Sequence, residues 1–290
     1  RANLREISLK LKDFDAGQVE ILKKVLNGIG VDDHLIVESI EWPDQRLAVF
    51  FTSTKKADKV WLSLRTLKLR NVKLVSRTLK KRDWQTKWKE EFKPFALTNT
   101  FGVIPLWQKG KFTFHKRMPI YINTDLAFGT GLHATTKYMV QFIERLRGRF
   151  KSFFDVGAGT GILSIVAEKC GASQIDAVDI DAEAVKVARS NFYENQCTSA
   201  HVKIADAHKM KVRKKYDLVC ANILTQDLIQ MADQLVCAVH PGKYLAVSGI
   251  SLNSYEAFRK AYAIYPLKCI KVEKGDGWAA ILFQKPVLTK

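Results

Sequence analysis

Three closely spaced glycines follow a strand-like run, and this pattern could bind a ligand. Residues 153–161 read Phe-Phe-Asp-Val-Gly-Ala-Gly-Thr-Gly. Glycines let the backbone approach a ligand closely, and the N-terminus of the helix expected to follow favours a carboxylate or phosphate. The pattern therefore predicts a cofactor site at Gly157 and Gly159, although a glycine turn in some other α/β enzyme would look alike.

The spacing of these glycines distinguishes two kinds of cofactor. The dinucleotide fingerprint G-x-G-x-x-G would need glycine at position 162, where the chain has Ile162. The G-x-G-x-G spacing, together with an acid just before the turn at Asp155, favours S-adenosylmethionine over NAD. We therefore expect Asp155, Gly157 and Gly159 to belong to an S-adenosylmethionine site.

Acids also follow the next two expected strands. Asp179 ends the run Ile175–Asp179, where a carboxylate can accept hydrogen bonds from both ribose hydroxyls. Asp181 is expected to be the N-cap of the following helix. Asp206 comes after the third strand and could reach the adenine amino group, but it could equally well solvate its own loop.

The methyl acceptor is expected near Ala221-Asn222-Ile223-Leu224, at the end of the strand 216–221. The amide oxygen of Asn222 could orient an amine, or Asn222 could simply cap the strand. Nucleobase and glutamine methyltransferases carry a Pro-Pro-aromatic motif here, on which a planar group stacks. This chain has neither the prolines nor the aromatic residue, which favours an aliphatic amine as the acceptor.

A glycine-containing loop precedes the first helix of the expected sheet domain. Phe128 is followed by Gly129-Thr130-Gly131, a pattern that predicts a mobile flap with an apolar tip. Phe128 would then form a wall that excludes water from the acceptor amine. Gly129 and Thr130 are assigned to the cofactor site.

Two further side chains close this segment. Thr136 could cap the helix or donate to a carboxylate. His133 could act as a base, but a single histidine on a loop is more often a bystander. We therefore assign no general base, and Asn222 and Phe128 are the expected amine-positioning residues.

Alternating strands and helices must position these residues. Strands are expected at 152–156, 174–179, 201–205, 216–221 and 243–249, and helices at 134–147, 161–170, 182–194, 226–239 and 253–263. This order predicts a parallel, doubly wound sheet. Two last strands, 267–273 and 278–284, read as a hairpin, which resembles the ending of the seven-stranded class I methyltransferase fold.

The sequence divides into three expected parts. Residues 1–80 show the order β-α-β-β-α-β of a ferredoxin-like α+β domain, which could recognise a substrate or only pack on its neighbour. Residues 81–118 are expected to form a linker helix and short strands. The basic, aromatic run 77–93 favours an interdomain helix over a nucleic-acid site, because its aromatics repeat at helical spacing. Residues 119–290 form the expected methyltransferase domain.

The composition limits the kind of partner and the compartment that can be expected. The 290 residues include 47 Lys and Arg against 29 Asp and Glu, a formal charge of +18, so an anionic partner is expected. Five dispersed cysteines without a C-x-x-C pair are typical of a reduced, cytoplasmic protein without a metal site. No apolar run approaches the ~18 residues that would span a bilayer.

Several segments together resemble the bacterial ribosomal protein L11 methyltransferase family. The specific matches are Ala127–Gly131, Asp155–Ile165, Asp179–Asp181 and Ala221–Leu224. The resemblance implies methyl transfer from S-adenosylmethionine to lysine and N-terminal amines of a large-subunit ribosomal protein, recognised by the N-terminal domain. It also implies that four residues bind the cofactor: Thr136, Gly157, Asp179 and Asn222. A cytoplasmic monomer with at most incidental RNA contact is expected.

The chain departs from the family pattern at two places. It has Asn123-Thr124-Asp125 where the family usually has Asp-Pro-Gly, and Thr225-Gln226-Asp227 where a small residue and Gly-Pro usually follow. Two other functions stay open from the residues. The positive charge and the basic run 209–215 would suit an RNA methyltransferase, and a non-catalytic S-adenosylmethionine-dependent binding protein is the third reading.

Overall fold

The chain folds into two compact units, residues 1–92 and 93–290. The computed structural model describes residues 4–12, 14, 16–31, 36–39, 46–51, 54–79, 93–123, 134–211 and 213–287. Among these residues, no helix is long and apolar enough to cross a membrane. The two units are described separately below.

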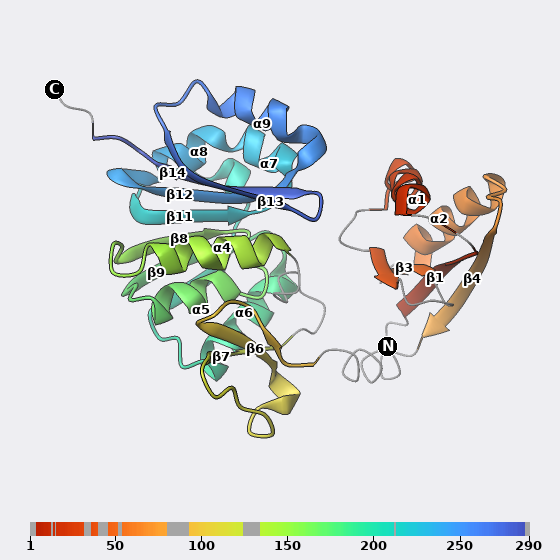
Figure 1. The fold of residues 1–290 in the computed structure, drawn as a ribbon, viewed down its shortest axis with the longest axis horizontal. Helices are drawn as coiled ribbons and strands as arrows, with labels where there is room; N and C mark the ends of the chain where they lie inside the picture. The colour runs from red at the N-terminus through yellow and green to blue at the C-terminus, as the bar shows by residue number, and fades with distance from the viewer. Residues whose placement is uncertain are drawn as a thin grey trace. The chain divides into compact units, whose positions relative to one another are not determined.

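The first unit has the predicted ferredoxin-like order. Its elements are β1 (Leu4–Leu11), α1 (Ala16–Gly28), β2 (Ile36–Ser39), β3 (Arg46–Phe51), α2 (Thr54–Thr66) and β4 (Val72–Leu79). The strands pair antiparallel in the order β2-β3-β1-β4, and both helices lie on one side of the sheet (Figure 1). Ile7, Leu9 and Leu11 alternate along β1 and pack against Leu26 of α1 and Leu64 of α2 in one buried core.

The second unit is built on the predicted seven-stranded sheet. Its strand order is β10-β9-β8-β11-β12-β14-β13. The bounds are β8 (Ser152–Val156), β9 (Gln174–Asp179), β10 (Ala200–Ile204), β11 (Tyr216–Asn222), β12 (Val239–Ser251), β13 (Lys268–Gly275) and β14 (Trp278–Gln284). Strands β8 to β12 are parallel, while β13 and β14 form the antiparallel hairpin that the sequence predicts.

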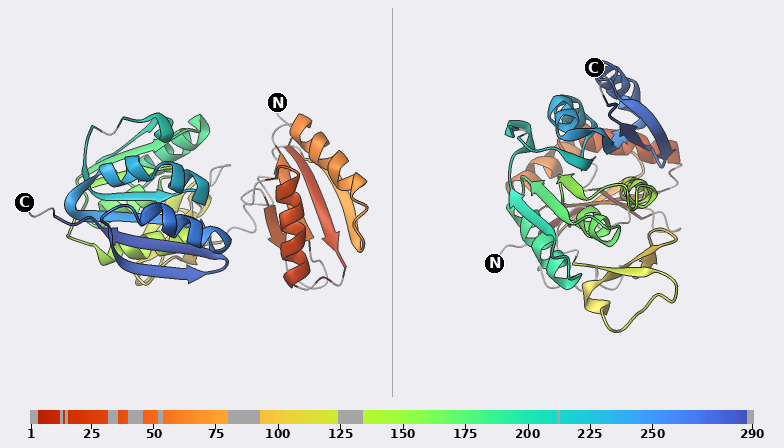
Figure 2. Two further views of the ribbon diagram at one scale, coloured as in Figure 1. Left: turned by 90° about the horizontal axis from the view of Figure 1, so that it is seen from above. Right: turned by 90° about the vertical axis from the view of Figure 1, so that its left-hand side faces the viewer.

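Helices cover both faces of this sheet (Figures 1 and 2). One face carries α4 (Ala134–Arg145), α5 (Ile162–Lys169) and α6 (Ala182–Glu194), and the other carries α7 (Thr225–Gln230), α8 (Ala232–Cys237) and α9 (Tyr255–Tyr262). The single helix expected over 226–239 is two helices, because Met231 leaves helical geometry with φ −99° and ψ 10°. Neither glycine nor proline marks this break in the sequence.

A small third sheet precedes α4, where the sequence predicts only short strands. It contains β5 (Phe95–Ala96), β6 (Phe101–Pro105) and β7 (Met118–Ile122), with the 3₁₀ turn η2 (Leu106–Gln108) after β6. β6 is buried along its whole length, and β7 lies against α5 and α6. The linker helix expected before it, with Trp84 and Trp88, lies outside the described residues.

Candidate active site

The candidate site lies where the sheet reverses its direction of growth. From β8 the chain adds β9 and β10 on one side, and it then returns to add β11 and β12 on the other. In open α/β sheets, ligands bind outside the carboxyl ends of the strands at such a switch point. The glycine turn follows β8, and Asp179 and Asn222 are the last residues of β9 and β11, so neighbouring strands position these predicted residues.

The glycine turn after β8 needs glycine for backbone conformation. Gly157, Gly159 and Gly161 have φ of 75°, 53° and 77°, in the left-handed region that side chains disfavour. The N–H groups of Gly157 and Ala158 donate to the carbonyl oxygen of Val178, at 2.9 and 3.0 Å. These bonds tie the turn to the end of β9, and α5 begins directly after it.

Asp179 is joined directly to this turn. Its Oδ2 accepts the N–H of Gly159 at 2.8 Å, and its Oδ1 accepts the N–H of Asp181 at 2.9 Å. Each carboxylate oxygen can accept more than one hydrogen bond, so Asp179 keeps acceptor capacity for two hydroxyl groups. Asp181 itself caps α6 by accepting the N–H of Glu183, as predicted.

The segment after β11 packs against the glycine turn. A Cβ at Gly157 would lie 2.4 Å from Cγ2 of Ile223, so the close approach of the two segments requires glycine. A Cβ at Gly249 would lie 2.0 Å from the carbonyl oxygen of Ile223. Ile223 is therefore held between the turn and β12, and it directly follows Asn222, the last residue of β11.

Thr225, one of the two departures from the family pattern, ties this segment to β12. Its buried hydroxyl donates to the carbonyl oxygen of Gly249 at 3.1 Å and accepts the N–H of Ser251 at 2.9 Å. The sequence offers no indication of this clamp. It stabilises the path of the chain immediately after Asn222.

Thr136 lies in the first turn of α4 and is fully buried. Among the residues that the structure describes, its Oγ1 has no hydrogen-bond partner, whereas buried hydroxyls are ordinarily paired. The residues just before α4, 124–133, lie outside the described part of the chain. The expectations for Phe128, Gly129, Thr130 and His133 all fall on that segment.

Asp155 is 1% exposed and faces α5, where the hydroxyl of Ser164 donates to its Oδ2 at 2.6 Å. No hydrogen-bond partner of its Oδ1 lies in the described part of the chain. Burial raises the pKa of Asp155 to about 6, although the hydrogen bonds of Ser164 oppose this shift. Asp155 thus lies inside the fold rather than at an accessible surface.

Asp206 caps the 3₁₀ turn η3 (Ala207–Lys209) after β10. Its Oδ1 accepts the N–H of His208 at 3.1 Å, and its Oδ2 lies 3.1 Å from Nζ of Lys209. The hydrogen bond from Lys209 lowers the pKa of Asp206. These contacts match the loop-solvating alternative, and they leave the adenine contact a prediction.

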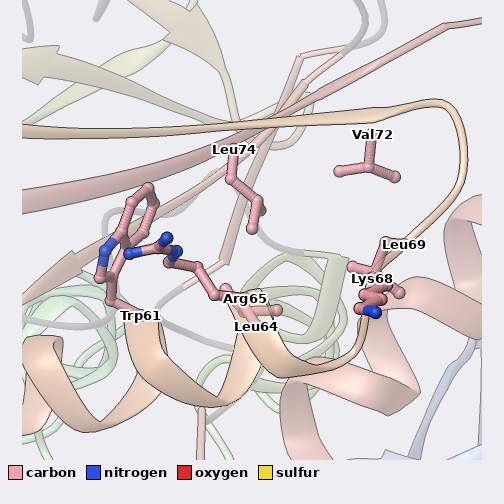
Figure 3. A pocket seen from close by; sticks show the side chains of 7 residues that line it. All are labelled: Trp61, Leu64, Arg65, Lys68, Leu69, Val72 and Leu74. Atoms are coloured by element: carbon pink, nitrogen blue, oxygen red, sulfur yellow. The ribbon is translucent and has the colours of Figure 1, made fainter.

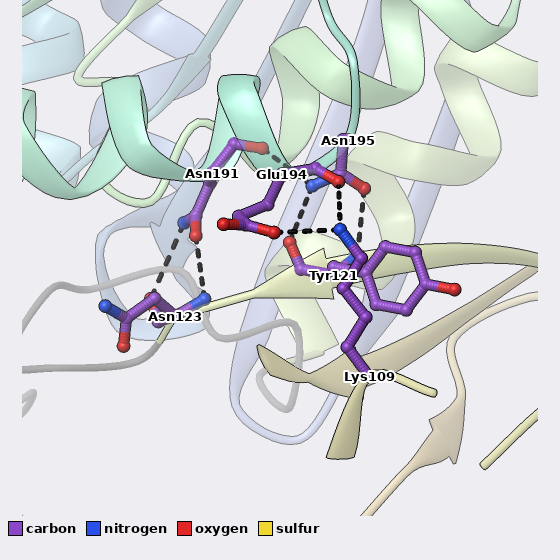
Figure 4. A network of polar contacts seen from close by, with 6 residues as sticks. All are labelled: Lys109, Tyr121, Asn123, Asn191, Glu194 and Asn195. Carbon is purple, nitrogen blue, oxygen red and sulfur yellow. Dashed lines mark hydrogen bonds and ion pairs between the residues drawn. The ribbon is translucent and has the colours of Figure 1, made fainter. Parts of the chain in front are cut away.

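Asn191 and Asn195, at the C-terminal end of α6, hydrogen-bond to β7 and to the residue that follows it, just before the segment 124–133 (Figure 4). Asn195 accepts the N–H of Tyr121 at 2.9 Å and donates to its carbonyl oxygen at 2.6 Å. Asn191, fully buried, accepts the N–H of Asn123 at 2.7 Å and donates to its carbonyl oxygen at 3.5 Å. The two side-chain amides thus pair with the backbone N–H and carbonyl groups of Tyr121 and Asn123, as the backbone of a neighbouring strand would.

Asn191 also reaches the glycine turn. Its Nδ2 donates to the carbonyl oxygen of Thr160 at 2.9 Å. One buried side chain therefore joins the turn at Thr160 to Asn123, the last described residue before the expected flap. Sequence reasoning missed this residue. The available signal was a pair of asparagines four positions apart at the end of an otherwise ordinary amphipathic helix.

A hydrogen bond joins Asp179 to the glycine turn, and the close approach of Ile223 to Gly157 brings the segment after Asn222 against the same turn. Asp155 bonds to Ser164 of α5, and Asp206 bonds to His208 and Lys209 of the turn that it caps. A seven-stranded switch-point sheet, a glycine turn bonded to an acid at the end of β9, and a closing antiparallel hairpin define a class I methyltransferase.

Comparison with known proteins identifies the family. The model of the family described as Ribosomal protein L11 methyltransferase (PrmA) matches residues 1–286. The ribosomal protein L11 methyltransferases of Staphylococcus aureus strains MRSA252 and bovine RF122 / ET3-1 are each 31% identical over 254 residues, covering 84% of this chain and 81% of theirs. This chain belongs to the ribosomal protein L11 methyltransferase family.

A solved structure agrees with this assignment. The ribosomal protein L11 methylase of Lactobacillus delbrueckii subsp. bulgaricus superposes with a TM-score of 0.62 at 26% identity. The match covers 67% of this chain and all of that one.

Proposed function

We propose that this enzyme transfers methyl groups from S-adenosylmethionine to lysine and N-terminal amines of ribosomal protein L11, in the cytoplasm. The observation that carries the proposal is the contact between the glycine turn and the Asn222 segment, through Gly157 and Ile223. This contact supports an arrangement in which the turn binds the cofactor and the amide of Asn222 orients the amine. The family match over residues 1–286 supplies the substrate class.

The residues at the switch point fit S-adenosylmethionine. Gly157 and Gly159 form a cradle in which side chains would clash or strain the backbone. Asp179 keeps acceptor capacity for the ribose hydroxyls, and the unpaired, buried Thr136 Oγ1 offers a donor for the carboxylate of the methionine part. When bound, S-adenosylmethionine supplies an activated methyl group on a positively charged sulfur.

The protein must present the acceptor amine in its neutral form. A lysine with a pKa of ~10.4 is neutral in only about one molecule in 2,500 at pH 7, a deficit of roughly 4–5 kcal/mol. An apolar mouth lowers the pKa of an amine by disfavouring its charged form. We assign this desolvation to Phe128 and the orientation of the amine to the carbonyl of the Asn222 side chain.

No general base is assigned, so the proton passes to solvent. Asp155 is unsuited to this role because its carboxyl group is buried against Ser164. His133 is the alternative base. In the variant His133→Ala, the methylation rate should still rise with pH above 7. If the variant instead loses a pH-dependent step of the rate near pH 6.5, His133 is the base.

An RNA acceptor is the outcome that would overturn the proposal. In the basic run 209–215, Lys209 pairs with Asp206 and Lys214 with Asp176, so part of its charge is used within the protein. Incubation of the enzyme with tritiated S-adenosylmethionine and ribosome-free extract distinguishes a protein acceptor from an RNA acceptor. We expect label that protease releases and RNase leaves in place, and the reverse would refute the protein acceptor.

A further inference from the structure

The sheet of the first unit carries a row of positive charges on the face away from its helices. Ile7, Leu9 and Leu11 face α1 and α2, so Lys10 points to the opposite face. In the strand register, Lys10 lies directly opposite Arg46 of β3 and directly opposite Lys73 of β4. We call Arg46, Lys10 and Lys73 the cation row.

Without a bound ligand, the alignment of three cations destabilises the folded state of the first unit. Side chains directly opposite one another on adjacent strands have Cβ atoms about 4.5–5.5 Å apart, and like charges there repel. Arg46 lies 3.8 Å from the carboxylate of Glu6. Lys10 and Lys73 are exposed, and no acid of the described residues lies within ion-pair distance of either. A bound anion would attract all three cations and so offset the repulsion within the row.

The cation row continues a strongly basic surface. Across residues 54–79, which include α2 and the edge strand β4, eight basic residues accompany Asp58 as the sole acid of that stretch. The basic residues are Lys55, Lys56, Lys59, Arg65, Lys68, Arg70, Lys73 and Arg77. This charge belongs to the first unit and lies outside the glycine turn and its neighbours, so methyl transfer does not account for it.

A groove of about 310 Å³ lies on the other side of β4, between this strand and α2 (Figure 3). It is lined by Trp61, Leu64, Arg65, Lys68, Leu69, Val72 and Leu74. The guanidinium of Arg65 points toward the indole of Trp61. Unpaired bases stack on aromatic rings and on guanidinium planes, whereas an acidic peptide needs no stacking surface.

We propose that the cation row binds the phosphates of single-stranded RNA. Neighbouring strands are about 4.8 Å apart, so three cations in one row span about 10 Å, enough to contact consecutive phosphates of one strand. On the helix side of the edge strand β4, the groove offers Trp61 and Arg65 as a stacking surface for a base of an RNA that passes around this edge. The inference concerns binding by the first unit and does not depend on the identity of the methyl acceptor.

The test uses the full-length protein without S-adenosylmethionine and a fluorescein-labelled 20-nucleotide RNA of mixed sequence. Fluorescence anisotropy gives the affinity between 50 and 200 mM KCl for the wild type and for the triple variant Lys10→Gln, Arg46→Gln, Lys73→Gln. The matched control removes one exposed arginine and two exposed lysines from the second unit: Arg149→Gln, Lys260→Gln, Lys268→Gln.

Three lost phosphate contacts should reduce the slope of log affinity against log salt by about 2, because each contact with a single strand contributes about 0.7. The same relation predicts an affinity about a hundredfold weaker at 100 mM salt for the triple variant. The control should change affinity by less than about fivefold, the weight of one contact. Equal losses in the two variants would overturn the proposal.

Two further measurements test the repulsion within the row and the class of its ligand. Without RNA, Lys10→Gln alone should raise the unfolding midpoint of the protein at low salt, because it removes the central charge of the row; a lowered midpoint would contradict the repulsion. Poly-L-glutamate should displace the RNA poorly. Displacement at equal charge concentration with an equal salt slope would assign the row to an acidic protein and refute RNA.

Discussion

Replacing Asn191 by alanine tests whether the buried amide between Thr160 and Asn123 couples the glycine turn to the segment that follows β7. The variant loses bonds of 2.7 and 2.9 Å to Asn123 and Thr160, and a long third bond of 3.5 Å. Loss of the bonds to the part-buried N–H of Asn123 and to the buried carbonyl oxygen of Thr160 costs about 1–3 kcal/mol each. Partial hydration and the better helix propensity of alanine offset part of this loss.

We therefore expect a net destabilisation of about 2–3 kcal/mol, which in a unit of this size lowers the melting temperature by roughly 4–12 °C. The turn is also less well ordered for the cofactor. Binding of S-adenosylhomocysteine, measured by calorimetry well below the melting temperature, should weaken about tenfold, or about 1.4 kcal/mol.

Asn195→Ala is the matched control. Asn195 lies one helical turn away and makes three hydrogen bonds, to the N–H and carbonyl of Tyr121 and to the carbonyl of Asn191, but none to the glycine turn. It should lower stability comparably and change the affinity for S-adenosylhomocysteine by less than twofold. If both variants bind S-adenosylhomocysteine like the wild type, Asn191 is a structural residue only and the coupling is refuted.

Three other changes give distinct outcomes. Asp179→Ala should weaken S-adenosylmethionine binding by about 1.5–3 kcal/mol in calorimetry, the range for hydrogen bonds to a charged group, and unchanged affinity would remove Asp179 from the site. Asp155 has a pKa raised to about 6, so the folded protein binds its proton more tightly than the unfolded chain, and wild-type stability should fall as pH rises from 4 to 6. Denaturation of Asp155→Asn across that range should show a stability gain over the wild type that grows by about 2 kcal/mol, and a constant difference would contradict the shift. Thr225→Val should lower kcat with little loss of cofactor affinity, because the path after Asn222 loosens, while Thr225→Ser should retain activity; equal loss in both would show that the hydroxyl is not the reason.

Sequence periodicity was sufficient to predict the elements that position the site. The strands expected at 152–156, 174–179 and 216–221 are β8, β9 and β11 of the structure, with bounds that agree within one residue. The glycine turn and the N-cap at Asp181 are local patterns, which the sequence reveals directly. The break at Met231 follows no local signal, so a single helix was the reasonable but wrong expectation.

The remaining features depend on partners distant in the sequence. Asn191 bonds to Asn123, 68 positions away, and Thr225 bonds to Gly249, 24 positions away. No local pattern specifies such pairs, because asparagine and threonine in helices usually indicate only a polar surface. The burial of Asp155 is similar: an acid before a glycine turn suggests a ligand contact, whereas its surroundings in β8 and α5 determine that it faces Ser164.

Intact-mass spectrometry of ribosomal protein L11 most directly tests the central claim. Purified L11 from the same organism is incubated with S-adenosylmethionine and either the wild-type enzyme or Asp179→Ala, with ribosomal RNA present in a parallel reaction. The wild type should add mass in steps of one methyl group, located by fragmentation on lysine or N-terminal amines, and Asp179→Ala should add far less at limiting cofactor. An unmodified L11 beside a methylated RNA would contradict the account.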